Sequence, residues 1–523
     1  MNADAIVIGS GPNGLVAANL LADAGWDVLV LEGQPTPGGA VRTQELTLPG
    51  FHHDVFSAFY PLGAGSPHIR GLHLEDHGLR WRRSEIVVAH PATDGTCAAL
   101  SHDPAETEAS LDAFAPGDGE RWRTAVMDLW GKAGGPFVET LLSPMPPVRA
   151  ATKLAAALGP TGLVDFARFG LLSVRRFAEE NFRGVGAGRL LASNALHADI
   201  TPDSAGGALF GWVLVGLGQH VGWPVPEGGA GNLAAAMLRR LDAGGGRVEC
   251  NRRVERVLVR GGKAYGVRTA DGEEHTARHA VLADVAAPAL YGDLLSETPL
   301  PARVARGMRR FQYDSATFKV DWALDGPIPW QNPEAARAGT VHVTEGMDSL
   351  SQISADLNRG HIPKRPFLLL GQYASYDASR QPEGKETAWA YTHVPQTVDG
   401  DAGGELTGRW DAEEAERFAD RMEGEVEAVA PGFRKRVLAR HVMAPPHLQE
   451  RNENLVNGAL NGGTAQLHQQ LVFRPWPGLG RAETPIGGLF LASASAHPGG
   501  GVHGGPGANA AKAALWHRRV RLR

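Results

Sequence analysis

The feature that most constrains this chain is residues 5–42, where β-type and α-type sequence alternate. Residues 5–8 form a short apolar run of the kind that a buried parallel strand needs. The turn Gly9-Ser10-Gly11-Pro12-Asn13-Gly14 follows, then good helix formers over residues 15–24 and a second apolar run over residues 26–31. This order predicts strand, turn, helix and second parallel strand, which is how a doubly wound α/β fold begins.

The glycine turn has the spacing G-x-G-x-x-G, and its place between a strand and a helix predicts dinucleotide binding. Gly9 allows the tight turn, Gly11 lets the backbone approach a pyrophosphate, and Gly14 lets helix and strand pack closely. Glu32 ends the second run and is expected to accept the hydroxyls of an adenosine ribose. A glycine turn without a ligand is the competing interpretation, but the strand, helix, second strand and acid follow one another at the spacing that a dinucleotide site needs.

The residues after Glu32 specify the cofactor. Residues 34–43 contain a Gly38-Gly39 turn and then Arg42, and they resemble the second signature of glutathione-reductase-like FAD proteins in the amine oxidase and phytoene desaturase families. The resemblance implies FAD rather than NAD, with backbone near the flavin side and Arg42 paired with the pyrophosphate. The contacts that it implies here involve Gly9, Gly11, Pro12, Asn13, Gly14, Glu32, Gly33, Gly38, Gly39, Ala40, Val41 and Arg42.

The C-terminal part closely resembles the last FAD motif of phytoene desaturases. A strand-like run at residues 488–492 precedes a Pro-Gly-Gly-Gly turn at residues 498–501 and a helix-like run at 508–516. The family's Gly–acid pair is replaced by Ala494-Ser495, so the resemblance implies that Ser495 takes the place of a carboxylate on the ribityl chain. Backbone at Gly501, Val502 and His503 is expected at the flavin pyrimidine edge, where a helix N-terminus stabilises negative charge.

The middle of the chain returns to the nucleotide domain. Residues 233–242 are helix-like, 247–250 strand-like, 254–269 a β-meander and 280–284 another strand. This order again resembles phytoene desaturases, in which the residue at the position of Val254 contacts the adenine through its backbone. No second G-x-G-x-x-G with flanking strand and helix appears, so a dedicated NAD(P)H domain is not expected.

The resemblance implies an α/β protein: a glutathione-reductase-like Rossmann FAD domain with an interleaved α+β substrate domain. A chain of 523 residues exceeds what one core usually serves. We expect residues 1–75, 215–292 and 475–523 in the FAD-binding domain, and 76–214 and 293–474 in the substrate-binding domain. Residues 76–200 look mainly helical, whereas strand-like runs in 310–400 predict an antiparallel sheet over a substrate cavity.

Composition excludes several classes of function. A net charge of −6 argues against a nucleic-acid-binding surface. Cys97 and Cys250, the two cysteines, are too few for a disulfide scaffold or a multi-cysteine metal site, and neither falls at the C-terminal flavin motif, so the FAD is expected to be non-covalent. Because the chain begins with a strand, no signal peptide is expected and a cytoplasmic location is favoured.

Two residues are candidates for acid–base chemistry. Lys319 sits where the related amine oxidases place a lysine that holds water near flavin N5, although a solvent-facing strand lysine is the competing interpretation. His503 is expected beside the flavin, where its imidazole could accept a proton near neutral pH.

The leading hypothesis is an FAD-dependent desaturase, dehydrogenase or oxidase that takes a hydride from a hydrophobic substrate, such as an isoprenoid, a polyketide or a lipid-like aromatic. Oxygen or a quinone would serve as the electron acceptor, and a homodimer is a further hypothesis. One alternative is a redox-neutral flavin-dependent isomerase. Another is a flavinless binding or escort protein on the same fold, against which the complete glycine motifs argue.

Peripheral membrane contact is a hypothesis about substrate delivery. Residues 163–178 are predicted to form one amphipathic helix, with Arg168, Arg175 and Arg176 available to anionic lipid, and residues 518–523 form a basic end. The competing interpretation is a helix packed on a domain core. Residues 204–226 lack Asp, Glu, Lys and Arg, but their apolar part is short and glycine-rich, which favours a buried helix over a membrane span.

Overall fold

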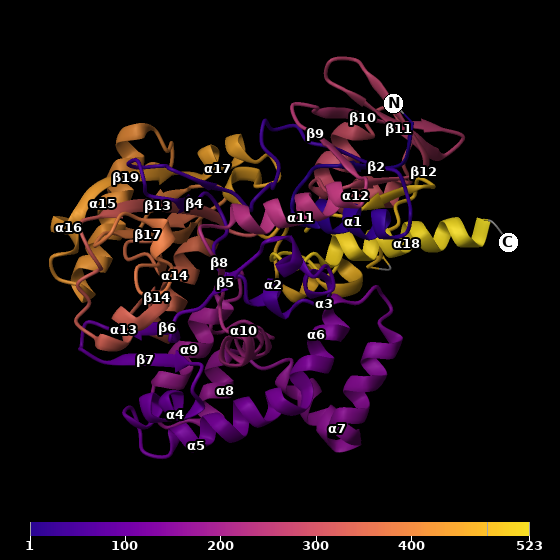
Figure 1. Cartoon of the computed structure of the whole chain (residues 1–523). Helices are drawn as coiled ribbons and strands as arrows, with labels where there is room; N and C mark the ends of the chain where they lie inside the picture. The colour runs from indigo at the N-terminus through magenta and orange to yellow at the C-terminus, as the bar shows by residue number, and fades with distance from the viewer. Residues whose placement is uncertain (1, 479, 522–523) are drawn as a thin grey trace.

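The computed structural model describes residues 2–478 and 480–521. Within them, two seven-stranded sheets and a layer of helices make up the molecule (Figure 1). In this view the first sheet lies at the upper right, the second at the left, and helices α4 to α10 below.

The first sheet has the order β10-β11-β12-β1-β2-β9, with β20 paired to β12. Its strands are β1 Asn2–Ile8, β2 Val28–Leu31, β9 Arg247–Glu249, β10 Val254–Arg260, β11 Lys263–Thr269, β12 Glu274–Ala283 and β20 Leu489–Leu491. β1 runs parallel to β2 and β12, and β20 runs parallel to β12. Helices α1 Pro12–Asp23, α11 Gly231–Ala243 and α18 Gly505–Arg521 share one apolar core with the sheet, so both ends of the chain meet there (Figure 1).

The second sheet has the order β19-β13-β17-β16-β14-β6-β7. Its strands are β6 Ile86–Pro91, β7 Cys97–Ser101, β13 Ala316–Leu324, β14 Ala338–Val343, β16 Leu368–Gln372, β17 Glu386–Val394 and β19 Val437–Met443. All neighbours are antiparallel except β6 and β14. Helix α15 Ala412–Val429 begins at Asp411, whose side chain accepts from Glu414 N, and buries Phe418, Met422 and Val426 in a core shared with this sheet.

The helical layer packs around Trp212, which is fully buried in a cluster of aromatic rings. Its helices are α4 Pro104–Asp112, α5 Asp118–Trp122, α6 Gly135–Leu142, α7 Val148–Phe169, α8 Val174–Asn181, α9 Gly186–Ala195 and α10 Gly207–Val221. The remaining elements are α2 Pro61–Gly65, α3 Pro67–Arg70, α12 Ala302–Met308, α13 Pro333–Arg337, α14 Met347–Asn358, α16 Phe433–Arg436, α17 Pro445–Arg451, β3 Thr43–Gln44, β4 His53–Asp54, β5 Trp81–Arg82, β8 Val225–Pro226, β15 His361–Ile362 and β18 Gly400–Asp401. In the described parts of the chain, no helix has both the length and the apolar character needed to cross a bilayer.

One local prediction was confirmed with an addition, and another was wrong. Residues 76–200 are mainly helical, as expected, but they also contain the β6–β7 hairpin, whose apolar residues are buried at one edge of the second sheet. The single helix expected over residues 163–178 is two helices, because α7 ends at Phe169 and α8 begins after Ser173. Ser173 caps α8 by accepting a hydrogen bond from Arg176 N, and this local capping outweighs the continuous apolar periodicity.

The strands of the first sheet all lie in residues 1–75, 215–292 and 475–523, and those of the second in residues 76–214 and 293–474. This distribution supports the division into two discontinuous domains, which we keep as a proposal. The arrangement sets the carboxyl end of β1 opposite the second sheet, and the main cavity lies there.

Candidate active site

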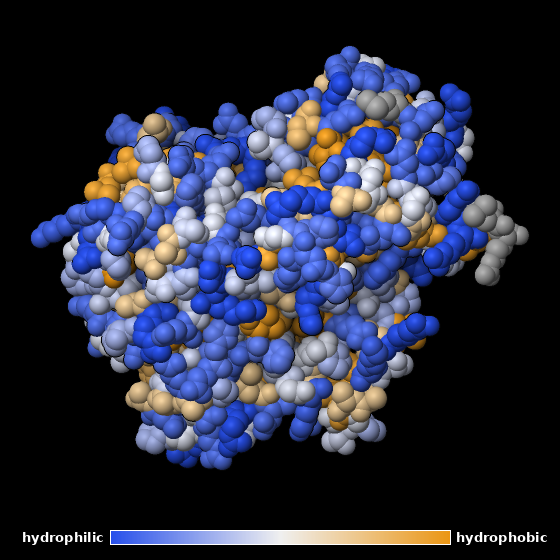
Figure 2. All heavy atoms as spheres, in the orientation of Figure 1, coloured by the Kyte–Doolittle hydropathy of each residue, from blue (hydrophilic) through white to orange (hydrophobic). Residues whose placement is uncertain are grey.

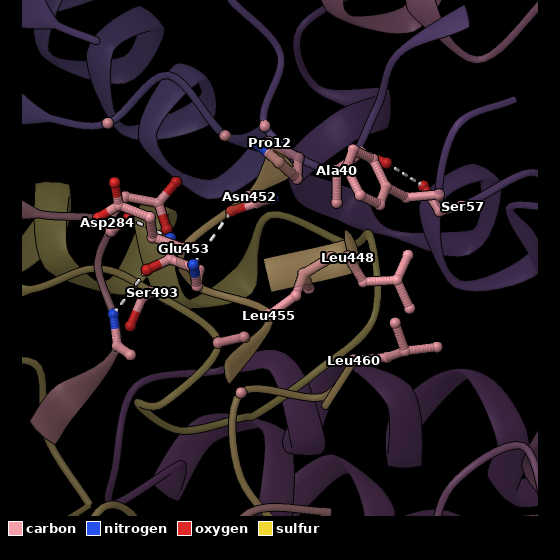
Figure 3. A pocket seen from close by; sticks show the side chains of 18 of the residues that line it. Pro12, Ala40, Ser57, Asp284, Leu448, Asn452, Glu453, Leu455, Leu460 and Ser493 are labelled. Atoms are coloured by element: carbon pink, nitrogen blue, oxygen red, sulfur yellow. Dashed lines mark hydrogen bonds between the residues drawn. The ribbon is translucent and has the colours of Figure 1, made fainter. Parts of the chain in front are cut away.

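A cavity of about 1030 Å³ is lined by residues from both sheets. Its volume is at the upper end of the roughly 300–1,000 Å³ that ligand pockets span. We call one end the cradle, defined by Gly9, Gly11, Glu32, Arg42 and Asp284. We call the other end the chamber, defined by Phe59, His197, Lys319, Trp389 and Tyr391. In Figure 3, Asp284, Asn452, Glu453 and Ser493 gather on one side of the pocket, and Leu448 and Leu460 on the other.

The glycine turn of the cradle is packed backbone against backbone. A Cβ atom on Gly14 would lie 2.3 Å from Gly9 O, and one on Gly39 would lie 2.7 Å from Gly11 Cα. Gly9 and Gly39 also have positive φ angles, +91° and +56°. Helix α1 starts after Gly11; Pro12 has no N–H, Gly14 N donates to Asp284 and Leu15 N donates to Gly11 O, so Asn13 N is the amide of the first turn that is left for an anion.

Glu32 is held in place at the end of β2. Its Oε2 accepts hydrogen bonds from Ser10 N (2.8 Å) and Ser10 Oγ (2.6 Å), and its Oε1 accepts one from Gln34 N (2.8 Å). These use three of the roughly four acceptor sites that a carboxylate offers. The side chain is buried but lines the cavity. About one acceptor site is left for a ribose hydroxyl, and this contact stays a prediction.

Asp284 completes the cradle, although no sequence motif pointed to it. It follows β12, and its Oδ2 accepts a hydrogen bond from Gly14 N (2.8 Å). Burial raises the pKa of Asp284 to about 7, the charge of Glu32 adds to this, and the Gly14 hydrogen bond opposes it. The signal that could have found it is an acid placed directly after an apolar strand, at the carboxyl edge where α/β proteins bind ligands.

Arg42 brings a positive charge to the cavity. Its Nη2 donates to Arg451 O (2.7 Å), and its guanidinium lies 5.0 Å from the centre of the Phe56 ring. Its Nε is buried and has no hydrogen-bond partner among the described residues. A buried guanidinium N–H at the wall of the cavity that the start of α1 also lines fits the pyrophosphate of FAD.

The structure brings most of the predicted cofactor residues to one cavity. Those that line it are Gly9, Gly11, Pro12, Asn13, Glu32, Gly33, Gly39, Ala40, Arg42, Val254, Ser495, Gly501 and Val502. Gly14, Gly38, Val41 and His503 are not among the described lining residues; Val41, for example, is fully buried in the core. Ser495 Oγ donates to Gly462 O (2.8 Å) and accepts from Ala287 N (3.1 Å), so its ribityl contact stays a prediction.

The geometry argues against His503 as a proton acceptor. Its Nδ1 accepts a hydrogen bond from Gly505 N (3.0 Å), so in the neutral ring Nε2 carries the proton, and Nε2 donates to Gly500 O (3.1 Å). Burial lowers the pKa of His503 to about 4. Because neither nitrogen is free, the imidazole stabilises the turn instead, and we do not assign it an acid–base role.

Lys319 lies in the wall of the chamber on β13. It is buried, which excludes the solvent-facing interpretation of its position, and its Nζ is paired with Asp321 on the same face of the strand. Nζ also lies 5.9 Å from the centre of the Trp389 ring. Burial lowers the pKa of Lys319, while the charge of Asp321 opposes this change. A buried ion pair at a cavity wall is typical of functional sites, but a catalytic role for Lys319 stays a prediction.

Most of the other residues of the chamber are aromatic or apolar. The rings of Trp389 and Tyr391 stack at 6.1 Å, and Phe59 lies 5.9 Å from Trp389. Leu369 adds to the lining, as do Leu448 and Leu460; Figure 3 shows the latter two. Such a surface favours the apolar part of a ligand and excludes water from it.

Comparisons with known proteins bear on this site. The model of the family "Flavin containing amine oxidoreductase" matches residues 13–385. Pyridine nucleotide-disulfide oxidoreductase domain-containing protein 2 of Mus musculus is 29% identical over 554 aligned residues, which cover 97% of this chain and 92% of the relative. A phytoene desaturase (neurosporene-forming) of Cereibacter sphaeroides is 24% identical, with coverage of 96% and 92%.

A solved structure, an oxidoreductase from Methanosarcina mazei, has a TM-score of 0.63 and 18% identity, and covers 99% of this chain and 100% of that one. At this identity the likeness shows the fold alone. These matches confirm the family resemblance, the fold class and the FAD cofactor that the sequence predicts. The chain belongs to the flavin-containing amine oxidoreductase family and is an FAD-dependent oxidoreductase.

Proposed function

We propose that this oxidoreductase takes a hydride from a C–H bond of a hydrophobic substrate, such as an isoprenoid, a polyketide or a lipid-like aromatic, and holds its FAD without a covalent link. The observation that carries the proposal is a single cavity that joins the glycine cradle to an aromatic chamber with a buried lysine in its wall. When bound, FAD supplies the hydride-accepting chemistry. The similarity to a phytoene desaturase supports this substrate class by analogy.

Each end of the cavity has its own task. In the cradle, Arg42 and the first turn of α1 would bind the pyrophosphate, and Glu32 would orient the ribose. In the chamber, the Trp389 ring and its neighbours exclude water and position the substrate. Lys319, held by Asp321, would fix a water molecule or a polar group at the wall.

The test begins with the cofactor. Purified protein should be yellow, and acid or heat should release FAD into the supernatant. Colour that stays with the precipitated protein would contradict a non-covalent cofactor.

The hydride step is tested by mixing the holoenzyme anaerobically with a panel of isoprenoids and aromatic polyketides. Bleaching of the flavin absorbance without oxygen supports hydride transfer, and bleaching by none of these compounds speaks against this substrate class.

The electron acceptor separates the remaining enzyme alternatives. The sequence shows no second nucleotide motif, so NADPH should reduce the flavin slowly or not at all in stopped flow. Oxygen or a quinone is then the proposed acceptor. Rapid, stoichiometric bleaching by NADPH that is required for turnover but gives no net oxidation would favour the redox-neutral isomerase instead.

Substrate delivery from a membrane surface is part of the proposal. Hydrophobic residues lie over α7 at the lower right of Figure 2. Val148 and Val164 of α7, and Leu171 just after it, are more than half exposed. The arginines expected to bind lipid are engaged elsewhere, since Arg168 and Arg176 both pair with Glu180. Any contact through α7 would therefore be mainly apolar. Residues 522 and 523 of the basic end lie outside the described residues.

Two further hypotheses also remain proposals. A homodimer would be tested by light scattering coupled to gel filtration. A cytoplasmic location would be tested by fractionating cells that express the tagged chain.

A further inference from the structure

A chain of hydrogen-bonded histidines runs from the chamber into the protein. His197 Nε2 lies 2.7 Å from His342 Nε2, and His342 Nδ1 lies 2.9 Å from His90 Nε2. The far end is Ser193, whose Oγ lies 3.3 Å from His90 Nδ1. His90 and His342 come from the neighbouring parallel strands β6 and β14, and both are fully buried. Only His197, which follows α9, reaches the cavity.

The histidines of this hydrogen-bonded row are neutral, and their hydrogen bonds can run in either of two directions. Burial lowers the pKa of His90 and of His197 to about 3, and it also lowers the pKa of His342 well below its ordinary value. A neutral imidazole has one N–H donor and one acceptor nitrogen, so each link fixes the next. If Ser193 accepts from His90, then His197 donates through Nε2 and its Nδ1 is an acceptor. If Ser193 donates, every bond reverses and His197 Nδ1 carries the hydrogen.

The cavity end of this chain has no protein partner. Among the described residues, no hydrogen bond reaches His197 Nδ1, and the ring packs edge-on against Trp223 at 5.1 Å. Thr340 lies on the same face of β14 as His342, two residues away, and lines the same cavity. Its Oγ1 is buried and has no partner in the described part of the chain. His197 Nδ1 and Thr340 Oγ1 are therefore two polar groups without protein partners among the described residues, on side chains of residues that line a largely aromatic chamber.

We propose that His197 is a polar subsite of the chamber and binds an oxygen function, a hydroxyl or a carbonyl, of an otherwise apolar substrate. This rests on the proposed function and narrows its substrate class from a plain hydrocarbon to an oxygenated one. Because the polarity of the His342–His90–Ser193 chain can reverse, His197 can accept from a hydroxyl or donate to a carbonyl. Thr340 Oγ1 is the second group that such an oxygen would reach.

The test compares three ligands with one carbon skeleton: p-menthane, menthol and menthone. Each is titrated into FAD-loaded protein, and the dissociation constant is read from the change in the flavin spectrum. Replacing His197 by Leu should raise the dissociation constants of menthol and menthone about tenfold, as expected for the loss of about 1.4 kcal/mol. The dissociation constant of p-menthane should change by less than about twofold. His197→Gln, which keeps a donor and an acceptor, should recover part of the preference.

Two variants complete the design. His220→Leu, at an exposed position of α10, is the matched control and should bind all three ligands as the wild type does. His342→Phe leaves His197 in place but removes its hydrogen-bond partner, and should raise the dissociation constants of menthol and menthone about threefold. FAD content and the thermal midpoint report whether each variant is folded.

The outcomes separate the two proposals. Equal responses of the three ligands to His197→Leu, or a wild type that does not bind menthol or menthone, would overturn the subsite while the protein stays yellow. Protein without FAD would instead speak against the cofactor cradle and the proposed function as a whole.

Discussion

The cradle and the chamber share one cavity but are built in opposite ways. The cradle is built around a glycine turn in which backbone packs on backbone: a Cβ on Gly14 or Gly39 would meet main-chain atoms, and Glu32 is held by the amides of Ser10 and Gln34. The chamber is made of side chains that reach in from strands far apart in the sequence, such as Lys319 and Trp389. Changes in the cradle should therefore affect cofactor binding. Changes in the chamber should affect the reactivity of the flavin and the choice of substrate.

The largest expected effect comes from Gly14→Ala. The added Cβ would lie 2.3 Å from Gly9 O, which is backbone and cannot move without reshaping the turn. We expect FAD affinity to fall by on the order of 100-fold, about 2.7 kcal/mol, measured by titrating apoprotein with FAD. The matched control is Gly292→Ala, where a Cβ meets nothing within 4 Å. Normal affinity in Gly14→Ala would show that the turn is not the cofactor site.

Glu32→Ala should weaken FAD binding by a similar or smaller factor. Three of the roughly four acceptor sites of the carboxylate are used within the protein, so the variant would remove about one hydrogen bond to the ribose, worth about 1.5–3 kcal/mol. The variant also leaves Ser10 N and Gln34 N without their acceptor, so Glu32→Gln is needed to separate ribose binding from loop structure. Glu255→Ala, exposed on the nearby strand β10, serves as the control. Unchanged FAD affinity in Glu32→Ala would mean that the carboxylate serves only the loop.

Asp284→Asn should change how stability depends on pH. Between about pH 4, the usual pKa of an aspartate, and pH 7, its pKa here, the folded chain keeps a proton that the unfolded chain has released. The free energy of unfolding therefore falls as pH rises through this window, by up to about 1.4 kcal/mol per pH unit. Asp284→Asn lacks this loss. The unfolding free energy of the variant, relative to that of the wild type, should therefore rise from about pH 5 to about pH 7.

The measurement is the thermal midpoint of the apoprotein across this range at one scan rate. Other buried acids, such as Glu386, titrate in both proteins and cancel in the difference. Asp325→Asn is the control, because that carboxylate is largely exposed. Parallel curves for wild type and Asp284→Asn would contradict the raised pKa.

Lys319→Met tests the chamber without touching the cradle. We expect normal FAD content but a lower flavin midpoint potential, because a buried positive charge that favours the reduced, negative cofactor is lost. A shift on the order of 30 mV corresponds to about 1.4 kcal/mol for a two-electron couple. It is measured by reductive titration with a reference dye, with exposed Lys435→Met as the control. An unchanged potential would restrict Lys319 to packing.

Membrane contact should be the smallest effect. If α7 and the turn after it bind through their exposed apolar residues, the protein should co-sediment with liposomes to a similar extent at low and high salt. Val164→Ser together with Leu171→Ser should abolish this binding. Binding that salt removes would point to the basic end instead, where each basic residue contributes roughly 1 kcal/mol near an anionic surface. No co-sedimentation at low salt would leave a soluble carrier as the route.

Much of the cradle could be predicted because it depends on local sequence. The G-x-G-x-x-G turn, its flanking elements and Glu32 are adjacent in the chain, and the structure places them at one end of the cavity. Asp284 escaped notice because it lies 270 residues from Gly14, the amide that it accepts from. The break between α7 and α8 escaped notice because apolar periodicity continued across a glycine and a serine that end one helix and cap the next.

By itself, the sequence determined the cofactor, the fold class and the family, because backbone sites need glycines at fixed spacing and leave a readable pattern. Only the tertiary structure decided what the chamber is. It buried Lys319 instead of exposing it, occupied both nitrogens of His503, and aligned His90, His342 and His197 from three separate segments. The physical reason is that the protonation and the direction of a side chain depend on which distant strands pack around it, and spacing along the chain carries no record of that.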